Sequence, residues 1–172
     1  MSKQTMKKND MLSDLSPQKV KELYRDNQKF LGRLQKKRPK NLDQIFEETH
    51  KEVFNEFDCL ECANCCKTTS PIFKDKDIDR IAKSMRMKSG KFIEQYLQRD
   101  EDYDYVLQTA PCSFLNDDNT CSIYDVRPNA CKEYPHTNRK KMYQLMPLTL
   151  KNTEVCPATL KIVEKVKLLM GS

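Results

Sequence analysis

The chain has little of several things that common protein classes need. It has only three glycines, Gly32, Gly90 and Gly171, and no tryptophan. With so few glycines, the sequence contains no glycine-rich loop of the kind that cradles nucleotide phosphates. No stretch approaches the ~18 consecutive apolar residues of a membrane-spanning helix, and residues 1–10 lack the apolar run of a secretory signal. We therefore expect a cytoplasmic protein whose thiols stay reduced.

The apolar content is also low. Hydrophobic residues make up 38% of the 172-residue sequence and charged residues 33%. The core must then be small, and ligation of a metal, which exists only in the folded chain, would add to the free energy of folding. Charge is concentrated at one end, since residues 1–40 carry a net charge of +8 and the remainder carries −2. We interpret the basic part as a solvated helix face, with a nucleic-acid contact as the less favoured alternative.

Three segments follow from the pattern along the chain. Residues 1–15 are polar and without periodicity, which predicts a disordered tail. Residues 16–57 predict a basic helical arm, in which amphipathic helices over 16–37 and 41–57 pair as an antiparallel hairpin. Residues 58–172 form the predicted cysteine-cluster metal-binding domain. The expected fold class is mainly α with a small β-hairpin, in a compact cysteine-rich domain organised around metal or iron–sulfur sites.

Several short elements are expected within the cysteine-cluster domain. Asp77 and Ser89 each have a side chain suited to capping a short helix. The acidic stretch over 100–104 is interpreted as a solvated loop. The other expected elements are a strand over 105–109, a hairpin over 112–124, a short helix over 128–133, an extended segment over 142–150 and a helix from Pro157.

Eight cysteines are the main chemical signal of the sequence. Without an export signal we reject the alternative of four disulfides and expect the thiols to bind metal. Three thiols in a Cys-x-x-Cys-x-x-Cys run are typical of a bacterial ferredoxin loop, whereas structural zinc sites more often use two separate Cys-x-x-Cys pairs. The predicted metal ligands are Cys59, Cys62, Cys65, Cys66, Cys112, Cys121, Cys131 and Cys156.

The number of metal sites stays open at this level. Two sites of four cysteines each is the simplest count, and one site with spare or redox-active thiols is the main alternative. The expected cofactor is one or two [4Fe-4S] clusters, with Zn²⁺ as the alternative metal. The neighbours Cys65 and Cys66 cannot easily point at the same centre, so Cys66 could serve a second site or be free.

Two residues near the last of the clustered cysteines are candidates for contact with a cofactor. Arg127 precedes Cys131 by one helical turn and could offset the charge of a thiolate cluster. The alternative for Arg127 is a surface ion pair. Tyr124 accompanies it, although a core aromatic is the favoured interpretation. His136 is expected to be structural or exposed rather than a ligand.

Linked motifs run through the cysteine-rich region: Cys-x-x-Cys-x-x-Cys-Cys, Pro-Cys-x-Phe-Leu, Cys-x-Ile-Tyr-x-x-Arg-Pro-x-x-Cys and Tyr-Pro. Over residues 57–160 this pattern resembles the bacterial CxxCxxCC family of YkgJ-like cysteine-cluster proteins, described as zinc- or iron-chelating domains. The resemblance implies that the seven cysteines from Cys59 to Cys131 are the cluster residues, with Cys156 a late member. The same cysteine arrangement is similar to that of flagellin lysine methylases, which implies an iron–sulfur centre. Nothing in the resemblance explains the basic residues 1–40.

Three functions compete on these grounds. The leading hypothesis is a cytosolic metal-binding protein with a cysteine-ligated centre, an iron–sulfur cluster. The second is a zinc-stapled interaction module, which the small core supports. The third is an iron–sulfur-dependent enzyme similar to the lysine methylases, which rests on the resemblance alone because the sequence has no Cys/His or Ser/His arrangement with an orienting acid. The sequence identifies no substrate or protein partner.

Overall fold

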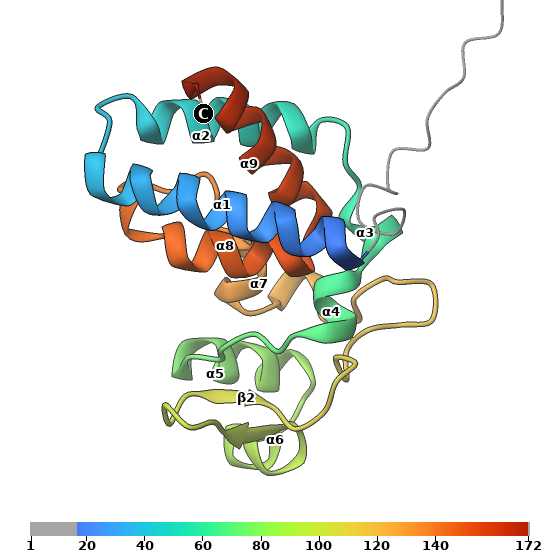
Figure 1. Ribbon diagram of the computed structural model, residues 1–172. Helices are drawn as coiled ribbons and strands as arrows, with labels where there is room; N and C mark the ends of the chain where they lie inside the picture. Colours follow the sequence, from blue (N-terminus) through green and yellow to red (C-terminus); the bar gives the residue numbers. More distant parts are fainter. Residues whose placement is uncertain (1–16, 172) are drawn as a thin grey trace, which may run out of the picture. The chain divides into compact units, whose positions relative to one another are not determined.

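The structure, a computed structural model, describes residues 17–171. The predicted disordered tail over 1–15 lies outside the described residues. The chain divides into two units, of which one holds the residues up to Asp58 together with those from Pro135 onward, and the other holds residues 59–134. We call the first the helical unit and the second the cysteine unit, and both can be followed in the ribbon of Figure 1.

The helical unit consists of helices from both ends of the chain. Within it, α1 packs against α8, α2 packs against α9, and α8 packs against α9. Figure 1 shows α1 running alongside α8, with α2 beside α9. The elements of this unit are α1 (Pro17–Lys37), α2 (Leu42–Phe54), the 3₁₀ helix η2 (Met142–Gln144), α8 (Met146–Val155) and α9 (Pro157–Met170).

This division differs from the predicted one, in which 16–57 is a separate arm and 58–172 is a single domain. The physical reason is the apolar side of α1, where Phe30 and Leu31 are buried and require a partner surface. The C-terminal helices supply that surface. A polar contact adds to it, since the carboxylate of Asp43 on α2 accepts the backbone N–H of Met142 at 2.8 Å.

The segment over 142–150 is helical, so the predicted extended conformation was wrong. Met142, Met146 and Leu150 are spaced four residues apart and all three are buried, which places them on one side of the helical chain. Pro147 lies in the first turn of α8, where backbone N–H groups have no partner within the helix. A proline, which lacks the N–H, therefore loses no helical hydrogen bond there. Packing of this apolar side against α1 and α9 stabilises the helix over the strand.

The cysteine unit combines short helices with one two-stranded antiparallel sheet. In this sheet Leu97 pairs with Leu107, around the acidic loop over 100–104. The mainly α class with a small antiparallel sheet is thus confirmed. The elements are α3 (Cys59–Cys62), α4 (Asn64–Thr68), α5 (Asp75–Ser84), α6 (Ser89–Tyr96), β1 (Leu97–Arg99), β2 (Tyr105–Leu107), the 3₁₀ helix η1 (Tyr124–Val126) and α7 (Asn129–Glu133).

Some details of this unit differ from the predictions. The hairpin expected over 112–124 is reduced to an isolated bridge between Leu115 and Cys121. Asp77 is not the N-cap residue of α5, because the helix begins two residues earlier. It contributes to the cap from the first turn, where its carboxylate accepts the backbone N–H of the N-cap residue Lys74. Ser89 begins α6 without capping it, and its hydroxyl donates to the carboxylate of Asp79 at 2.6 Å.

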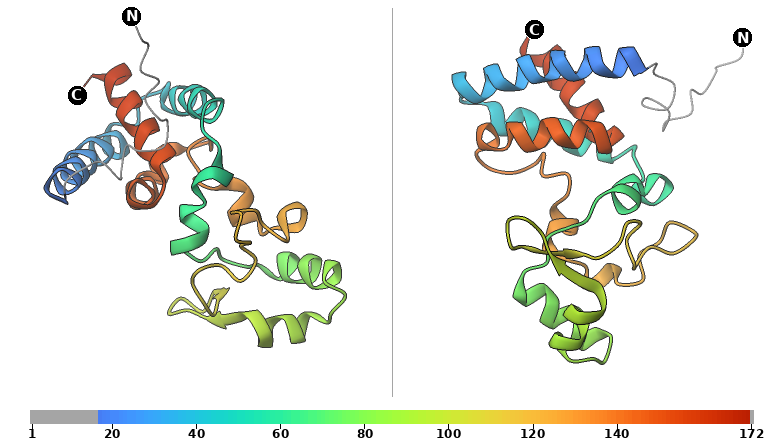
Figure 2. Two further views of the ribbon diagram at one scale, coloured as in Figure 1. Left: turned by 90° about the vertical axis from the view of Figure 1, so that its right-hand side faces the viewer. Right: turned by 60° about the horizontal axis from the view of Figure 1, so that its bottom comes forward.

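A small apolar core holds the cysteine unit together. Phe92 and Phe114 are stacked at its centre, with ring centroids 6.0 Å apart, and Ile81 is fully buried beside them. Cys112 and Cys121 are partly buried and pack against the same core, so these two thiols lie at its edge. Figure 2 gives two further views of the short elements that surround this core.

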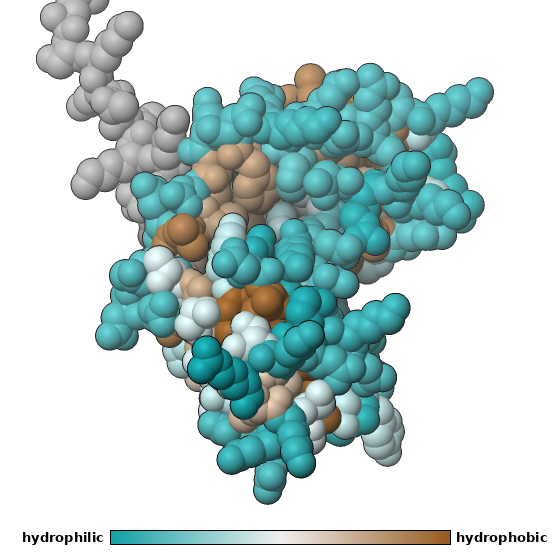
Figure 3. Space-filling view, turned by 180° about the vertical axis from the view of Figure 1, so that it is seen from behind, coloured by the Kyte–Doolittle hydropathy of each residue, from teal (hydrophilic) through white to brown (hydrophobic). Residues whose placement is uncertain are grey.

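Polar side chains cover most of the surface. Hydrophilic residues occupy most of the face drawn in Figure 3, with apolar residues visible in smaller areas. Within residues 17–171, every helix is too short or too polar to traverse a lipid bilayer.

Candidate metal centre

The first four cysteines lie on two short helices joined by a left-handed residue. Cys59 and Cys62 begin and end α3, three residues apart and therefore on one side of its single turn. Ala63 follows with φ +48°, and this backbone conformation turns the chain into α4, which carries Cys65 and Cys66. The run is partly open to water, with Cys59 exposed and the other three half-buried.

Three further cysteines approach this run from separate parts of the chain. Cys112 follows the cis peptide bond between Ala110 and Pro111. Its backbone N–H donates to the carbonyl of Cys66 at 2.8 Å, which joins the two cysteine-containing segments directly. Cys121 lies in the bridge with Leu115, and Cys131 lies in α7. The cysteine unit therefore holds seven of the eight predicted ligands.

The eighth, Cys156, belongs to the helical unit. It is buried at the junction of α8 and α9, where its carbonyl accepts the N–H of Leu160 at 3.1 Å. All eight cysteines are described, and none forms a disulfide.

Four thiols of the cysteine unit influence one another's ionisation. A negative charge on Cys66 raises the pKa of Cys112, Cys121 and Cys131. Charges on Cys112 and Cys121 also raise the pKa of Cys131. Such mutual effects require the groups to lie near one another. We call this set the inner thiols: Cys66, Cys112, Cys121 and Cys131.

The inner thiols differ in their readiness to ionise. A hydrogen bond with the Cys65 thiol lowers the pKa of Cys66 to about 7, and Lys67 acts in the same direction. Burial raises the pKa of Cys112 and that of Cys121. Burial, followed by the neighbouring thiols, raises the pKa of Cys131 to about 12. Cys66 is therefore the inner thiol that ionises most readily, and burial opposes ionisation of the other three.

Burial has the largest effect on the pKa of Cys112 and that of Cys121, and backbone N–H groups act against it. Those of Phe114 and Leu115 lower the pKa of Cys112, and that of Ile123 lowers the pKa of Cys121, because an N–H near sulfur stabilises the thiolate. Backbone N–H groups also tune metal-bound sulfur.

The predicted cation, Arg127, lies beside the inner thiols. Its positive charge lowers the pKa of Cys121 and that of Cys131. The guanidinium is stacked over the ring of Tyr124, with Cζ 3.8 Å from the ring centroid, and Nη1 donates to the Tyr124 carbonyl at 2.6 Å. Tyr124 itself is 50% exposed, so the favoured interpretation of this residue as a core aromatic was wrong.

The donor set fits more than one metal group. Cysteine thiolates bind both zinc and iron–sulfur clusters, and the inner thiols supply the four that either needs. Within residues 17–171, no three Cys, His, Asp or Glu side chains are arranged as a ready-made site for a single metal ion. The grouping is seen instead in the shared electrostatics of the thiols and in the backbone hydrogen bond between Cys112 and Cys66.

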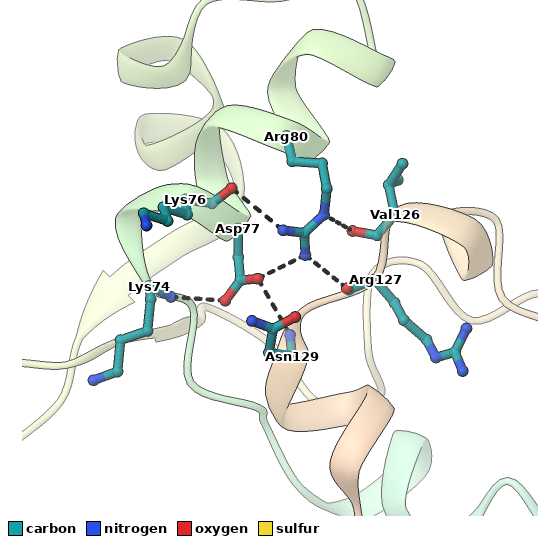
Figure 4. A network of polar contacts seen from close by, with 7 residues as sticks. All are labelled: Lys74, Lys76, Asp77, Arg80, Val126, Arg127 and Asn129. Atoms are coloured by element: carbon teal, nitrogen blue, oxygen red, sulfur yellow. Dashed lines mark hydrogen bonds and ion pairs between the residues drawn. The ribbon is translucent and has the colours of Figure 1, made fainter.

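An ion pair that the sequence did not predict contacts the segment before Cys131. Asp77 and Arg80 on α5 contact the backbone on both sides of Pro128, as Figure 4 shows. The only available signal was the three-residue spacing of opposite charges at the start of a helix, and such pairs are usually exposed. The burial of Asp77 is a property of the fold.

The comparisons with known proteins agree with this chemistry. A family model named CxxCxxCC, with the description "Putative zinc- or iron-chelating domain", matches residues 58–157. No curated protein and no solved structure matches the chain. The matched span covers more than half of the 172 residues and includes all eight cysteines. The chain therefore belongs to the CxxCxxCC family.

Proposed function

We propose that the chain holds a cysteine-ligated metal centre, an iron–sulfur cluster, in its cysteine unit. The observation that carries this proposal is the direct contact between two cysteine segments, in which the backbone N–H of Cys112 donates to the carbonyl of Cys66 at 2.8 Å. The effect of a charge on Cys66 on the other three inner thiols supports it. These thiols come from segments as far apart in sequence as Cys66 and Cys131. Convergence of distant thiols in a cysteine-rich unit is what a metal centre requires. The proposed ligands are Cys66, Cys112, Cys121 and Cys131.

Two neighbouring cations favour the ionised sulfur that metal binding needs, against the burial that raises the pKa of Cys112, Cys121 and Cys131. A thiol must lose its proton to bind metal. Lys67 lowers the pKa of Cys66, and Arg127 lowers the pKa of Cys131. The same cations would offset the negative charge of a thiolate-ligated cluster. When bound, such a cluster supplies one-electron redox chemistry, and Arg127 would contribute to its potential through charge.

The remaining cysteines stay proposed ligands on sequence grounds. Cys59, Cys62 and Cys65 have the spacing of a ferredoxin loop, which supports an iron–sulfur cluster over zinc and allows a second cluster. Cys156 lies within the span that matches the family. A reducing, cytoplasmic location fits eight cysteines of which none is in a disulfide.

Single-cysteine variants test the proposed ligands. We expect Cys66→Ser and Cys131→Ser each to lose most of the bound metal and to lower the thermal midpoint, because ligation and folding are coupled. Ser113→Ala is the control, since Ser113 is exposed next to Cys112 and carries no thiol. Retention of full metal content and an unchanged midpoint in Cys131→Ser would contradict the assignment.

A further inference from the structure

A partly buried ion pair between Asp77 and Arg80 lies on α5 of the cysteine unit. Asp77 is only 1% exposed, and its Oδ1 atom lies 2.6 Å from Nη2 of Arg80, three residues further along the helix. Burying charge costs free energy that a single contact does not repay unless the other polar atoms of the pair are also hydrogen-bonded. The remaining contacts of these two side chains therefore indicate what the pair stabilises.

Most of those contacts go to one stretch of backbone, the stretch that leads into α7 (Figure 4). The side chain of Arg80 bridges two successive carbonyls: Nε donates to Val126 at 3.3 Å and Nη2 donates to Arg127 at 2.9 Å. From the other side, Oδ1 of Asp77 accepts the backbone N–H of Asn129 at 3.2 Å. The pair thus forms hydrogen bonds to the backbone before and after Pro128.

The remaining atoms of the pair are bound to α5 itself. Oδ2 of Asp77 accepts the N–H of Lys74 at 3.2 Å, and Nη1 of Arg80 donates to the carbonyl of Lys76 at 3.4 Å. Both members of the ion pair are therefore also hydrogen-bonded at the start of α5, and α5 packs on the apolar core through Ile81. The core thereby helps to fix the position of the backbone around Pro128.

The backbone around Pro128 leads directly to the proposed ligand Cys131. The helix α7 has five residues, and a helix of that length is not stable by itself. Pro128 has no N–H, so the N–H of Asn129 is the first that this helix start offers, and Asp77 accepts it. Cys131 lies two residues further on, and its N–H donates to the carbonyl of Pro128 at 3.0 Å. The position of Cys131 therefore depends on contacts made by α5.

We propose that Asp77 and Arg80 are positioning residues, which hold Cys131 in the ligand set of the metal centre through the backbone of α7. The inference rests on the proposed function in one respect, namely that Cys131 is a ligand. It adds that the ligand geometry is set from α5, by a pair that precedes Cys131 by about 50 residues. Loss of the pair should release this one thiol while the other inner thiols stay in place.

Site-resolved alkylation of the full chain tests this proposal. The protein as purified is treated with iodoacetamide, and mass spectrometry measures the reaction rate of each cysteine before and after addition of a chelator. In the unmodified chain the four inner thiols should react slowly until the chelator is added. In Asp77→Asn, Cys131 should react about 10–100 times faster than in the unmodified chain, the range typical for the loss of an outer contact in a metal site. Cys66 and Cys112 should stay protected.

Two further variants separate positioning from general destabilisation. Ile81→Val removes a buried methylene from the same helix and leaves the ion pair intact, so it should not expose Cys131 selectively. Arg80→Lys keeps the charge but lacks the planar fork that reaches two carbonyls, so Cys131 should again react faster. Arg80→Lys also carries the test if Asp77→Asn does not fold.

The outcomes are distinguishable. Full protection of Cys131 in both Asp77→Asn and Arg80→Lys would overturn the proposal. It would also be overturned if all four inner thiols lost protection equally in these variants and Ile81→Val had the same effect. Failure of the proposed function looks different, because the chelator would then leave the four reaction rates unchanged even in the unmodified chain. In that case the positioning role is overturned as well.

Discussion

At the scale of single residues, neighbouring thiols have different acid–base properties for identifiable reasons. The pKa of Cys66 is lowered to about 7 by the hydrogen bond with Cys65, whereas burial and neighbouring thiols raise that of Cys131 to about 12. Because a thiol must lose its proton to bind metal, the lowered pKa of Cys66 favours ligation and the raised pKa of Cys131 opposes it.

The helical unit also contains a residue with a shifted pKa, His50. The ring of His50 packs on Phe54, with centroids 4.4 Å apart, and its Nδ1 lies 2.8 Å from Oγ1 of Thr137. Burial lowers the pKa of His50 below its ordinary value of 6.5. Because the folded chain then binds fewer protons than the unfolded chain, neutral His50 contributes stability above pH 6.5 that is lost as the pH falls toward the lowered value.

We expect His50→Gln to remove this pH dependence. The difference in free energy of unfolding between the unmodified chain and the variant should shrink as the pH falls from about 7 to about 5, around the ordinary histidine value. Denaturant unfolding of both proteins at the two pH values measures it. Parallel pH profiles for the two proteins would show that His50 has no shifted pKa in the folded state.

At the scale of elements, α8 offers the sharpest test of the packing. Met146 is 1% exposed on the packed side of this helix, while Leu148, two residues later, is 38% exposed. We expect Met146→Ala to destabilise the chain by about 2–5 kcal/mol and Leu148→Ala by less than about 0.5 kcal/mol. Thermal or denaturant unfolding measures both. Equal effects would indicate an extended segment in place of the helix, because residues two apart lie on the same side of an extended chain.

Sequence signals located two helix starts correctly, but they did not predict the conformation of the segment over 142–150. Prolines suited to the first turn correctly predicted the starts of α1 at Pro17 and α9 at Pro157. The segment over 142–150 is short, and its apolar residues fit a strand or a helix equally well. Its packing against helices more than 90 residues earlier, as in the contact from Asp43 to Met142, decides the outcome.

The candidate site was predictable in its chemistry and not in its geometry. The cysteine spacing indicates a thiol site because few other uses exist for such a cluster in a reducing compartment. Which thiols gather depends on contacts such as the one between Cys112 and Cys66, which no local pattern encodes. The burial of Asp77 was equally hidden, since a charged residue in the first turn of a helix usually faces solvent.

At the scale of the whole molecule, the two units should respond differently to metal removal. The helical unit buries apolar side chains from α1, α2, α8 and α9, while the smaller apolar core of the cysteine unit ends at its thiols. We expect a chelator to increase amide hydrogen exchange strongly over residues 59–134 and little over residues 21–58 and 135–171. An equal increase in all three ranges would contradict separate stabilisation of the two units.

The most direct test of the central claim is metal and acid-labile sulfide analysis of protein purified without oxygen, together with its visible spectrum. A cysteine-ligated iron–sulfur centre predicts brown protein with iron and sulfide in equal amounts, about four or about eight of each per chain. Colourless protein that contains stoichiometric zinc and no sulfide would contradict the iron–sulfur centre.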